Sequence, residues 1–441
     1  MTEAVGSKSE KSATASTGTR SARTSAGQGT RKRLQDAALD LFWEKGYCGT
    51  STRDVAATLG VQQASLYYHM KNKEELLHGI CYSALETLIE KAEAAVVIAR
   101  SPLEAIREIA RNHLATTLEF QKEFSIGVTE CRALGPEYRA EIEGLWSRYH
   151  MLTSSVLDDA KAGNYIRADV ANKYIYTPLM CTLIWSVLWY RQGKGLSVSQ
   201  LDEIFAAIYF EGAAGTKVRR NHRPATICHN LEALSSQTES IAPTHRNETY
   251  ARLLDTACDL FARKGYNATS IREIADAMGI RKASLYYYIS SKEDLIYEIS
   301  RAALEHMRTS VKWALEQVSG PEDKLYAFIT AHVVSLLQRQ KWHATSNEEL
   351  VTSTAEQRAE IVALRDAYEQ LARKLLEEAQ AAGVVRADIP SKFLGLVLFG
   401  MITHIYPWYQ PSVDVVPSEL GFILADLFMT GIAPEWPHRA I

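Results

Sequence analysis

Two stretches of the chain combine side chains that can hydrogen-bond to DNA base edges with side chains that can bind phosphate. Residues 62–77 read QQASLYYHMKNKEELL, and residues 281–296, which start 219 positions later, read RKASLYYYISSKEDLI. The two strings differ mainly in their first two residues. A glutamine amide suits adenine N6 and N7, whereas lysine or arginine suits guanine O6 and N7. The shared remainder offers hydroxyl groups and a lysine, which suit phosphate oxygens.

The duplication extends well beyond these strings. With the same displacement, residues 31–212 align with 250–431, and 24 of the first 50 aligned positions are identical. Later matches include His113 with His332 and Trp189 with Trp408. This period is far longer than the roughly 20 to 50 residues of solenoid and propeller repeats. We therefore expect one domain pair that occurs twice.

The start of each repeat is predicted to be a set of four helices. Apolar residues recur at the spacing of one helical face, and Gly46 follows them where a left-handed residue ends a helix. Ser51 and Asp54 are spaced to cap a short second helix. A third short helix is expected at 63–69 and a long fourth helix after it. The apolar stripe of the first repeat comprises Leu34, Ala37, Ala38, Leu41 and Phe42, and that of the second comprises Leu253, Ala257, Leu260 and Phe261.

A helix, a short helix, a glycine turn and a second short helix form the helix-turn-helix plan, whose last helix enters the DNA major groove. Around this plan the residues resemble the TetR family of one-component repressors. The motif reads Tyr47-x-x-Thr50-Ser51-x-Arg53-Asp54-Val55-Ala56, Leu59-Gly60-Val61, Ala64-Ser65-Leu66-Tyr67-Tyr68-His69 and Lys73-Glu74-x-Leu76 in the first repeat. In the second repeat it reads Tyr266, Thr269-Ser270, Arg272-Glu273-Ile274-Ala275, Gly279, Ala283-Ser284-Leu285-Tyr286-Tyr287-Tyr288 and Lys292-Glu293.

The resemblance implies an all-α fold of two tandem modules. Each module would be a three-helix helix-turn-helix DNA-binding domain followed by a helical ligand-binding and dimerisation domain. The expected boundaries are a disordered basic arm at 1–29, heads at 30–72 and 249–291, effector domains at 73–212 and 292–431, a linker at 213–248 and a tail at 432–441. The implied function is a transcriptional repressor in the cytoplasm, not an enzyme, that binds a double-stranded DNA operator and releases it on binding a ligand.

Several residues of each head are candidates for contact with DNA. Gln63 suits adenine and Lys282 suits guanine, while Gln62 and Arg281 are second base readers or phosphate contacts. By resemblance, the first and third members of each aromatic trio face the DNA. We expect phosphate contacts from the first turns of the second and fourth helices, where backbone amides and cations meet. The further candidates are Thr52, Arg53, Ala64, Tyr67, Tyr68, His69, Lys73, Arg272, Ala283, Tyr286, Tyr287, Tyr288 and Lys292.

The heads depart from the family pattern at one position. Many members have Ser or Thr at the cap before the recognition helix, whereas this chain has Gln62 and Arg281. Neither side chain is a preferred helix cap. We therefore expect the start of each recognition helix to lack a side-chain cap, so that its placement depends more on DNA.

Two long uncharged stretches, 174–190 and 393–413, occupy matching positions in the repeats. A membrane span would need about 20 apolar residues, but the first stretch is short and contains Pro178, and the second contains polar residues. A helix that is apolar all round is also typical of a buried interface. Because family modules pair through their last two helices, we expect an intramolecular pseudo-dimer. A homodimer of the whole chain is the alternative.

The ligand is less well defined by the sequence. The pattern from Glu130-x-Arg132 to Trp189-Tyr190-Arg191 resembles members that respond to acyl-CoA, so a small apolar or acyl-CoA-like effector is expected. Only the first repeat keeps Arg132 and Arg191, since the second has Val351 and Gln410. Candidate pocket residues, each of which also fits a core or interface role, are His113, Trp146, Tyr149, Trp185, Trp189, His332, His404 and Trp408.

The bulk composition favours no catalytic or metal chemistry. The 441 residues have a formal net charge of −3, so any basic surface must be local. The six cysteines are scattered, which fits a reducing compartment and neither a disulfide framework nor a zinc site. No cofactor is expected. An enzyme, which would need a phosphate loop or nucleophile motif, and a scaffold in which one head no longer binds DNA are the alternative functions.

Overall fold

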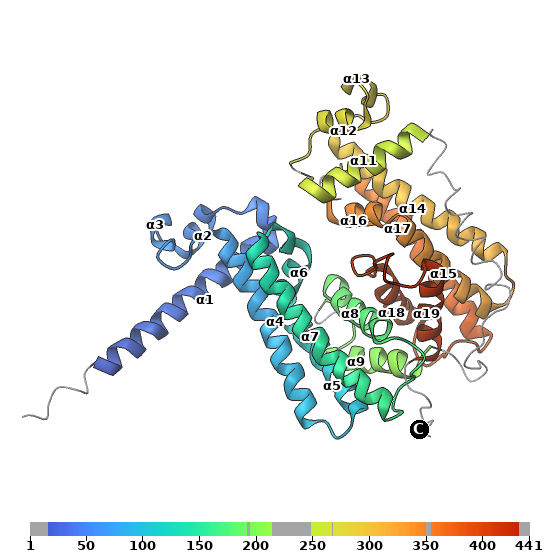
Figure 1. Ribbon diagram of the computed structural model, residues 1–441, viewed down its shortest axis with the longest axis horizontal. Coiled ribbons are helices and arrows are strands. Elements are labelled where there is room, and N and C mark those ends of the chain that lie inside the picture. The colour runs from blue at the N-terminus through green and yellow to red at the C-terminus, as the bar shows by residue number, and fades with distance from the viewer. Residues whose placement is uncertain (1–15, 192–194, 214–247, 267, 350–353, 432–441) are drawn as a thin grey trace, which may run out of the picture. The chain divides into compact units, whose positions relative to one another are not determined.

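The computed structural model describes residues 16–191, 195–213, 248–266, 268–349 and 354–431, without the side chains of 16–29, 132 and 347–349. Every regular element in this part of the chain is a helix, as the sequence predicts (Figure 1). No helix there is long and apolar enough to cross a membrane. The chain forms two compact units, Met1–Glu93 with Thr116–Met151 and Ala94–Ala115 with Leu152–Ile441, of which only the described residues are considered below.

The first unit contains the first head and the helices that support it. Its elements are α1 (Ser16–Gly49), α2 (Thr52–Leu59), α3 (Gln63–Leu66), most of α4 (Lys73–Ile98), the end of α5 (Pro102–Glu119), α6 (Gln121–Glu130), the short η1 (Cys131–Ala133) and the start of α7 (Pro136–Ala162). The predicted apolar stripe of α1 is buried. Ser51 and Asp54 form the expected capping box at the start of α2.

The second unit holds the rest of the described chain. From the first repeat it takes the ends of α4 and α7, most of α5, α8 (Asn172–Trp189), α9 (Val198–Ala206) and η2 (Ala207–Glu211). From the second repeat it takes α11 (Glu248–Lys264), α12 (Ile271–Met278), α13 (Lys282–Leu285), α14 (Lys292–Glu316), α15 (Pro321–Gln338), α16 (Gln340–Glu349), α17 (Ala355–Ala381), α18 (Ser391–Thr403) and α19 (Pro417–Thr430).

The N-terminal arm differs from the sequence prediction. The chain was expected to be disordered as far as residue 29, whereas α1 begins at Ser16. Extending an existing helix costs much less than starting one, because each added residue gains a backbone hydrogen bond. The predicted end of the core-facing helix is confirmed, since α1 is broken at Gly46, where φ is 73°. The equivalent Gly265 has φ 81°.

The last helices of the two repeats pack against each other within the second unit. Helix α8 of the first repeat lies along α18 of the second, and η2 contacts α19 (Figure 1). Gly212 and Gly431, which are equivalent positions, make reciprocal contacts there. A Cβ atom on Gly212 would overlap the carbonyl oxygen of Met429, and one on Gly431 would overlap that of Phe210. Both glycines also have positive φ, so only glycine fits these two crossings.

Candidate DNA interface and effector sites

The first recognition helix, α3, is tied to α2 through the predicted base reader Gln63. Its Nε2 donates to Thr52 Oγ1 at 2.8 Å, and Thr52 Oγ1 lies 3.5 Å from the Tyr67 hydroxyl. This bond leaves the Gln63 carbonyl oxygen and one N–H hydrogen free, which is the pair that adenine N6 and N7 require. Thr52 therefore orients the amide.

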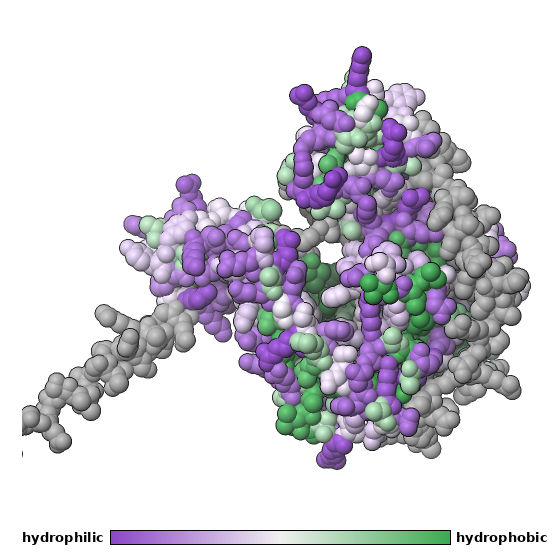
Figure 2. Space-filling model, in the orientation of Figure 1, coloured by the Kyte–Doolittle hydropathy of each residue, from purple (hydrophilic) through white to green (hydrophobic). Residues whose placement is uncertain are grey.

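The second recognition helix, α13, has no equivalent bond. Ile271 stands where the first head has Thr52, and it packs partly against the core of the head. Lys282, which replaces Gln63, is exposed and lies over the Tyr286 ring with Nζ 5.7 Å from its centre. Arg272 and Arg281 are exposed as well. The surface over both heads is mostly hydrophilic in the view of Figure 2.

Five of the six residues in the two aromatic trios are exposed. The middle residues, Tyr68 and Tyr287, are the most exposed, at 88% and 86%. Tyr67 and Tyr286 are about half exposed. Tyr288 is half-buried against the head core and 6.4 Å from the Tyr250 ring, whereas its equivalent His69 is exposed. The first repeat has Arg31 in place of Tyr250, which removes that aromatic neighbour.

The recognition helices begin without side-chain caps, as predicted. Gln62 and Arg281 both have extended backbone conformations at the cap position, and neither side chain bonds a backbone amide of the helix. Both residues are exposed, as are Ala64, Ala283 and Arg53. In the first turn of each helix, the Ser65 and Ser284 amides donate to the carbonyl oxygens of Gln62 and Arg281 at 2.9 and 2.8 Å.

The two lysines predicted to bind phosphate have partners inside the protein. Lys73 Nζ donates to the carbonyl oxygens of Tyr47 and Thr50 at 2.6 and 2.7 Å, and lies 4.0 Å from the centre of the Tyr47 ring. Lys292 repeats this arrangement at 3.0 and 3.1 Å in the second head. Each ammonium thus fixes the turn between the first two helices of its head. One of its three N–H groups remains for another acceptor.

Acidic and basic side chains connect each head to the helix that supports it. Lys122 of α6 pairs with Asp40 of α1 at 2.5 Å, and the equivalent Lys341 pairs with Asp259. In the first unit, Glu74 also accepts a bond from the Gly135 amide at 2.6 Å. The motifs alone do not single out these residues, but the alignment of the two repeats does, because all four charges are retained.

The candidate effector residues differ in exposure. His113, Tyr149 and His332 are almost fully buried. Trp146, Trp185, Trp189 and His404 are half-buried, and Trp408 is 43% exposed. Burial lowers the pKa of His113 and His332 to about 3, so both imidazoles are neutral near pH 7. Arg191 bonds the carbonyl oxygens of Leu188 and Tyr190, while the side chain of Arg132 and residue Val351 lie outside the described part of the chain.

His332 belongs to an aromatic cluster in the second effector domain. Its Nδ1 lies 2.9 Å from the Tyr368 hydroxyl. Phe328 stacks on Tyr368 with ring centres 5.5 Å apart, and Phe399 lies 6.0 Å from both His332 and Tyr368. Tyr368 was missed by the sequence analysis, although its equivalent Tyr149 was selected there.

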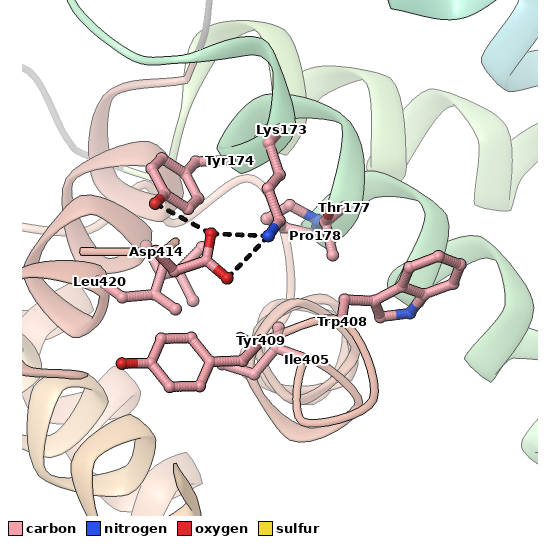
Figure 3. A pocket seen from close by; sticks show the side chains of 10 residues that line it. Lys173, Tyr174, Thr177, Pro178, Ile405, Trp408, Tyr409, Asp414 and Leu420 are labelled. Carbon is pink, nitrogen blue, oxygen red and sulfur yellow. Dashed lines mark hydrogen bonds and ion pairs between the residues drawn. The ribbon is translucent and has the colours of Figure 1, made fainter. Parts of the chain in front are cut away.

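Trp408 and the loop between α18 and α19 border a recess beside α8 (Figure 3). Lys173 Nζ contacts both carboxylate oxygens of Asp414 at 2.6 and 2.7 Å, and the Tyr174 hydroxyl donates to the same carboxylate at 3.2 Å. Burial acts to raise the pKa of Asp414, but the bonds from Lys173, the Gln410 amide and Tyr174 together outweigh it and the pKa is lowered. The cavity volume is about 20 Å³, which is room for about one water molecule.

An exposed helix-turn-helix followed by a larger helical domain, each present twice, defines a DNA-binding regulator. Comparison with known families agrees with this class. Residues 34–80 and 253–299 match the family described as bacterial regulatory proteins, tetR family. Residues 99–213 and 318–432 match the tetracyclin repressor-like C-terminal domain. The chain therefore belongs to the tetR family of bacterial regulatory proteins, and it contains the N-terminal and C-terminal domains of that family in tandem.

Individual relatives each correspond to about one repeat. The HTH-type transcriptional repressor KstR2 of Rhodococcus jostii is 27% identical over 188 residues, which are 42% of this chain and 91% of that protein. The fatty acid metabolism regulator protein of Bacillus subtilis is 21% identical over 184 residues, or 42% of this chain and 95% of that one. The solved structure of AibR with isovaleryl coenzyme A and operator DNA is 26% identical, covers 41% of this chain and 98% of AibR, and has a TM-score of 0.37.

Proposed function

We propose that the protein is a ligand-responsive transcriptional repressor whose two heads read the two halves of an imperfect palindrome. One observation carries this proposal. Both recognition helices are exposed and built alike, but Thr52 and Gln63 of the first head are replaced by Ile271 and Lys282 in the second. The first half-site would be richer in contacts to A·T pairs, and the second would be richer in guanine.

The remaining head residues would position the protein on the DNA backbone. Arg53 and Arg272 are exposed in the first turns of α2 and α12, where helix amides add to their charge. Tyr68 and Tyr287 are exposed enough to reach phosphates or base edges. Lys73 and Lys292 would act mainly by holding the turn that carries α2 and α12.

Pairing of the modules within one chain is part of the proposal. It is supported by the reciprocal contacts of Gly212 and Gly431 and by two equivalent arginines. Arg167 pairs with Asp426 at 2.6 Å, and Arg386 pairs with Glu211 at 3.2 Å, each from one repeat to the other. A homodimer of the whole chain would instead carry four heads, and light scattering of the purified protein distinguishes the two assemblies.

The effector domains would link a ligand to DNA release. We assign residues 30–72 and 249–291 to the DNA-binding heads and residues 73–212 and 292–431 to the effector domains. The effector domains would bind a small, largely apolar or acyl-CoA-like ligand, and the protein would act in the cytoplasm. KstR2, at 27% identity, is named a transcriptional repressor, which favours repression over activation. Release requires that the ligand bind the conformer that does not fit DNA more tightly, by a few kcal/mol for a strong response.

Operator selection followed by symmetrised operators tests this function. The preferred site is selected from random DNA, and two artificial sites are then made by repeating either half as a perfect palindrome. We expect both palindromes to bind at least tenfold more weakly than the selected site, because each mismatched half loses base contacts worth about 1 to 3 kcal/mol. Equal affinity for a perfect palindrome, or unchanged affinity after Lys282→Ala with Tyr286→Ala, would contradict two-headed reading.

A further inference from the structure

The second effector domain contains a group of basic side chains, two of them buried and two half-buried, that no function described above explains. It comprises His332 of α15, His343 of α16, Arg365 of α17 and His404 at the end of α18, and is called the histidine–arginine cluster here. The His332 and His343 side chains are 1% and 7% exposed. The four residues lie on or at the end of α15, α16, α17 and α18, which are labelled in Figure 1.

Each histidine of the cluster has a buried ring nitrogen without a hydrogen-bond partner. The atoms are Nε2 of His332, Nε2 of His343 and Nε2 of His404. A buried polar atom that is left without a partner costs about 1 to 3 kcal/mol, and native proteins rarely keep several together. Three such atoms in one domain therefore indicate that another group completes them.

Arg365 adds a half-buried positive charge to the cluster. Burial lowers its pKa, and this effect outweighs that of the carboxylate of Glu369, one turn further along α17, which acts to raise it. Its charge also helps to lower the pKa of His343 to about 3 and of His404 to about 4, after the larger effect of burial. The imidazoles are thus neutral near pH 7, and the cluster carries one cation with up to five N–H donors among neutral rings.

Aromatic side chains form an apolar wall beside these nitrogens. Phe328, Tyr368 and Phe399 pack around His332 with ring centres 5.8 to 6.4 Å from it. Tyr368 of α17 is buried and lies within hydrogen-bonding distance of His332 Nδ1. If the tyrosine hydroxyl donates to Nδ1, the proton of the neutral ring resides on Nε2, which then serves as a donor.

The first repeat does not contain the cluster. At the positions equivalent to His343, Arg365 and His404 it has Phe124, Trp146 and Trp185. Only the pair of His332 and Tyr368 is retained, as His113 and Tyr149. At these three positions the first repeat has aromatic side chains and the second has basic ones. This difference indicates that the two effector domains bind ligands of different chemistry.

We propose that the second effector domain binds an apolar carboxylic acid, whose carboxylate is held by the Arg365 guanidinium and the Nε2–H groups of the cluster. Arginine binds a carboxylate through two parallel hydrogen bonds, and the imidazoles supply donors to the remaining lone pairs. The hydrocarbon body packs on Phe328 and Phe399. This proposal names the ligand class of the second of the two effector domains. It rests on the proposed function, because only in a ligand-responsive repressor would binding of the acid control DNA release.

The cluster is in direct contact with the first repeat, so ligand binding there can affect the packing of the two repeats. The His404 ring lies against Trp185 of α8, with ring centres 4.5 Å apart, and the His404 carbonyl oxygen accepts from Cys181 Sγ at 3.3 Å. The Nε2 atoms are closed off from solvent, so an acid reaches them only after neighbouring side chains or helices move.

Binding is measured by calorimetry on the full-length protein with octanoate and 4-phenylbutyrate, against 1-octanol, methyl octanoate and octanoyl-CoA. We expect at least one acid to bind tenfold or more tightly than the alcohol and ester. Arg365→Gln should weaken acid binding at least tenfold, and Arg365→Lys should weaken it less. Arg373→Gln, at an exposed arginine about two turns further along α17, should leave it unchanged.

Two outcomes would overturn the proposal. They are equal binding of acid, alcohol and ester, or unchanged acid binding in Arg365→Gln. If Arg365→Gln does not fold, His343→Phe, which has the residue of the first repeat, takes its place with the same expected loss. Operator binding in the absence of acid, measured by gel shift, tests the proposed function separately. If the protein binds DNA but no acid, only the inference about the acid is wrong.

Discussion

Trp185 and His404 occupy equivalent positions in the two repeats, and their rings lie against each other with centres 4.5 Å apart. Equivalent residues meet in this way only near the axis that relates the repeats. In a homodimer such a pair would consist of two identical side chains, whereas the duplicated chain has an unlike pair. The contact therefore reports directly on the packing of α8 against α18.

Exchange of this pair should be tolerated better than either single change. Trp185→His or His404→Trp alone should lower the free energy of unfolding by about 1 to 2 kcal/mol, because two equal rings do not fit the site. The double variant restores the volume and should recover most of the loss. Urea denaturation followed by circular dichroism measures this, and strictly additive losses would show that the two rings are not coupled.

Alanine at either glycine crossing should destabilise the paired C-terminal helices. A Cβ atom on Gly431 meets the Phe210 carbonyl oxygen, and φ at this residue is 67°. We expect Gly431→Ala and Gly212→Ala each to cost about 2 kcal/mol or more, measured as a shift in thermal midpoint. Gly144→Ala in α7 is the matched control, since no atom lies within 4 Å of its added Cβ, and it should gain about 0.5 to 1 kcal/mol.

Salt dependence should separate the arginine of α2 from the lysine that begins α4. Each phosphate contact contributes about 0.9 to the slope of log affinity against log salt. Arg53→Ala should make that slope shallower by about 0.9, the contribution of one phosphate contact. Lys73→Met should lower the thermal midpoint, because the Tyr47 and Thr50 carbonyl oxygens lose their donor, with little change in slope. A full unit of slope lost in Lys73→Met would make that lysine a phosphate contact after all.

Two substitutions should give the first recognition helix the base preference of the second. Thr52→Ile with Gln63→Lys removes the amide and its acceptor and installs the pair found in the second head. We expect preference at the corresponding base pair to shift toward guanine by about tenfold, in line with 1 to 3 kcal/mol per bidentate contact. Competition gel shifts with single base-pair changes measure this. If the variant and the parent protein preferred the same base pair, Gln63 would not be a base-contacting residue.

Buried histidines should make the protein sensitive to mild acid. The pKa of His113, His332 and His343 is lowered to about 3 in the folded protein, below the value of about 6.5 in an unfolded chain. Between these values the unfolded state binds more protons, so stability is lost as the pH falls from about 6.5 toward 3. Each histidine contributes about 2 kcal/mol of this loss by pH 5.

Replacement of one buried imidazole should therefore flatten the pH dependence. His113→Gln should reduce the dependence of the unfolding free energy by about 1.4 kcal/mol per pH unit below pH 6. His69→Gln changes an exposed ring on the first head and serves as the control. Parallel pH profiles for His113→Gln and the parent protein would show that His113 takes up its proton without unfolding.

The sequence by itself determined the elements and their duplication. Helical spacing of apolar residues, the Ser51 capping box and the break at Gly46 are local properties, and local sequence decides them because their interactions span only a few residues. The missing cap at Gln62 is of the same kind. The motif residues of the recognition helices likewise indicated the DNA-binding class before any contact was known.

The tertiary structure alone decided which side chains meet over long distances. Nothing in the local sequence shows that Thr52 orients Gln63, that Lys73 bonds carbonyl oxygens, or that Tyr288 turns toward the head core. The histidine–arginine cluster gathers residues from α15 to α18, and its members become related only when those helices pack. Such contacts depend on the register between helices, which is set by the shape of the whole core and not by the spacing along any one segment.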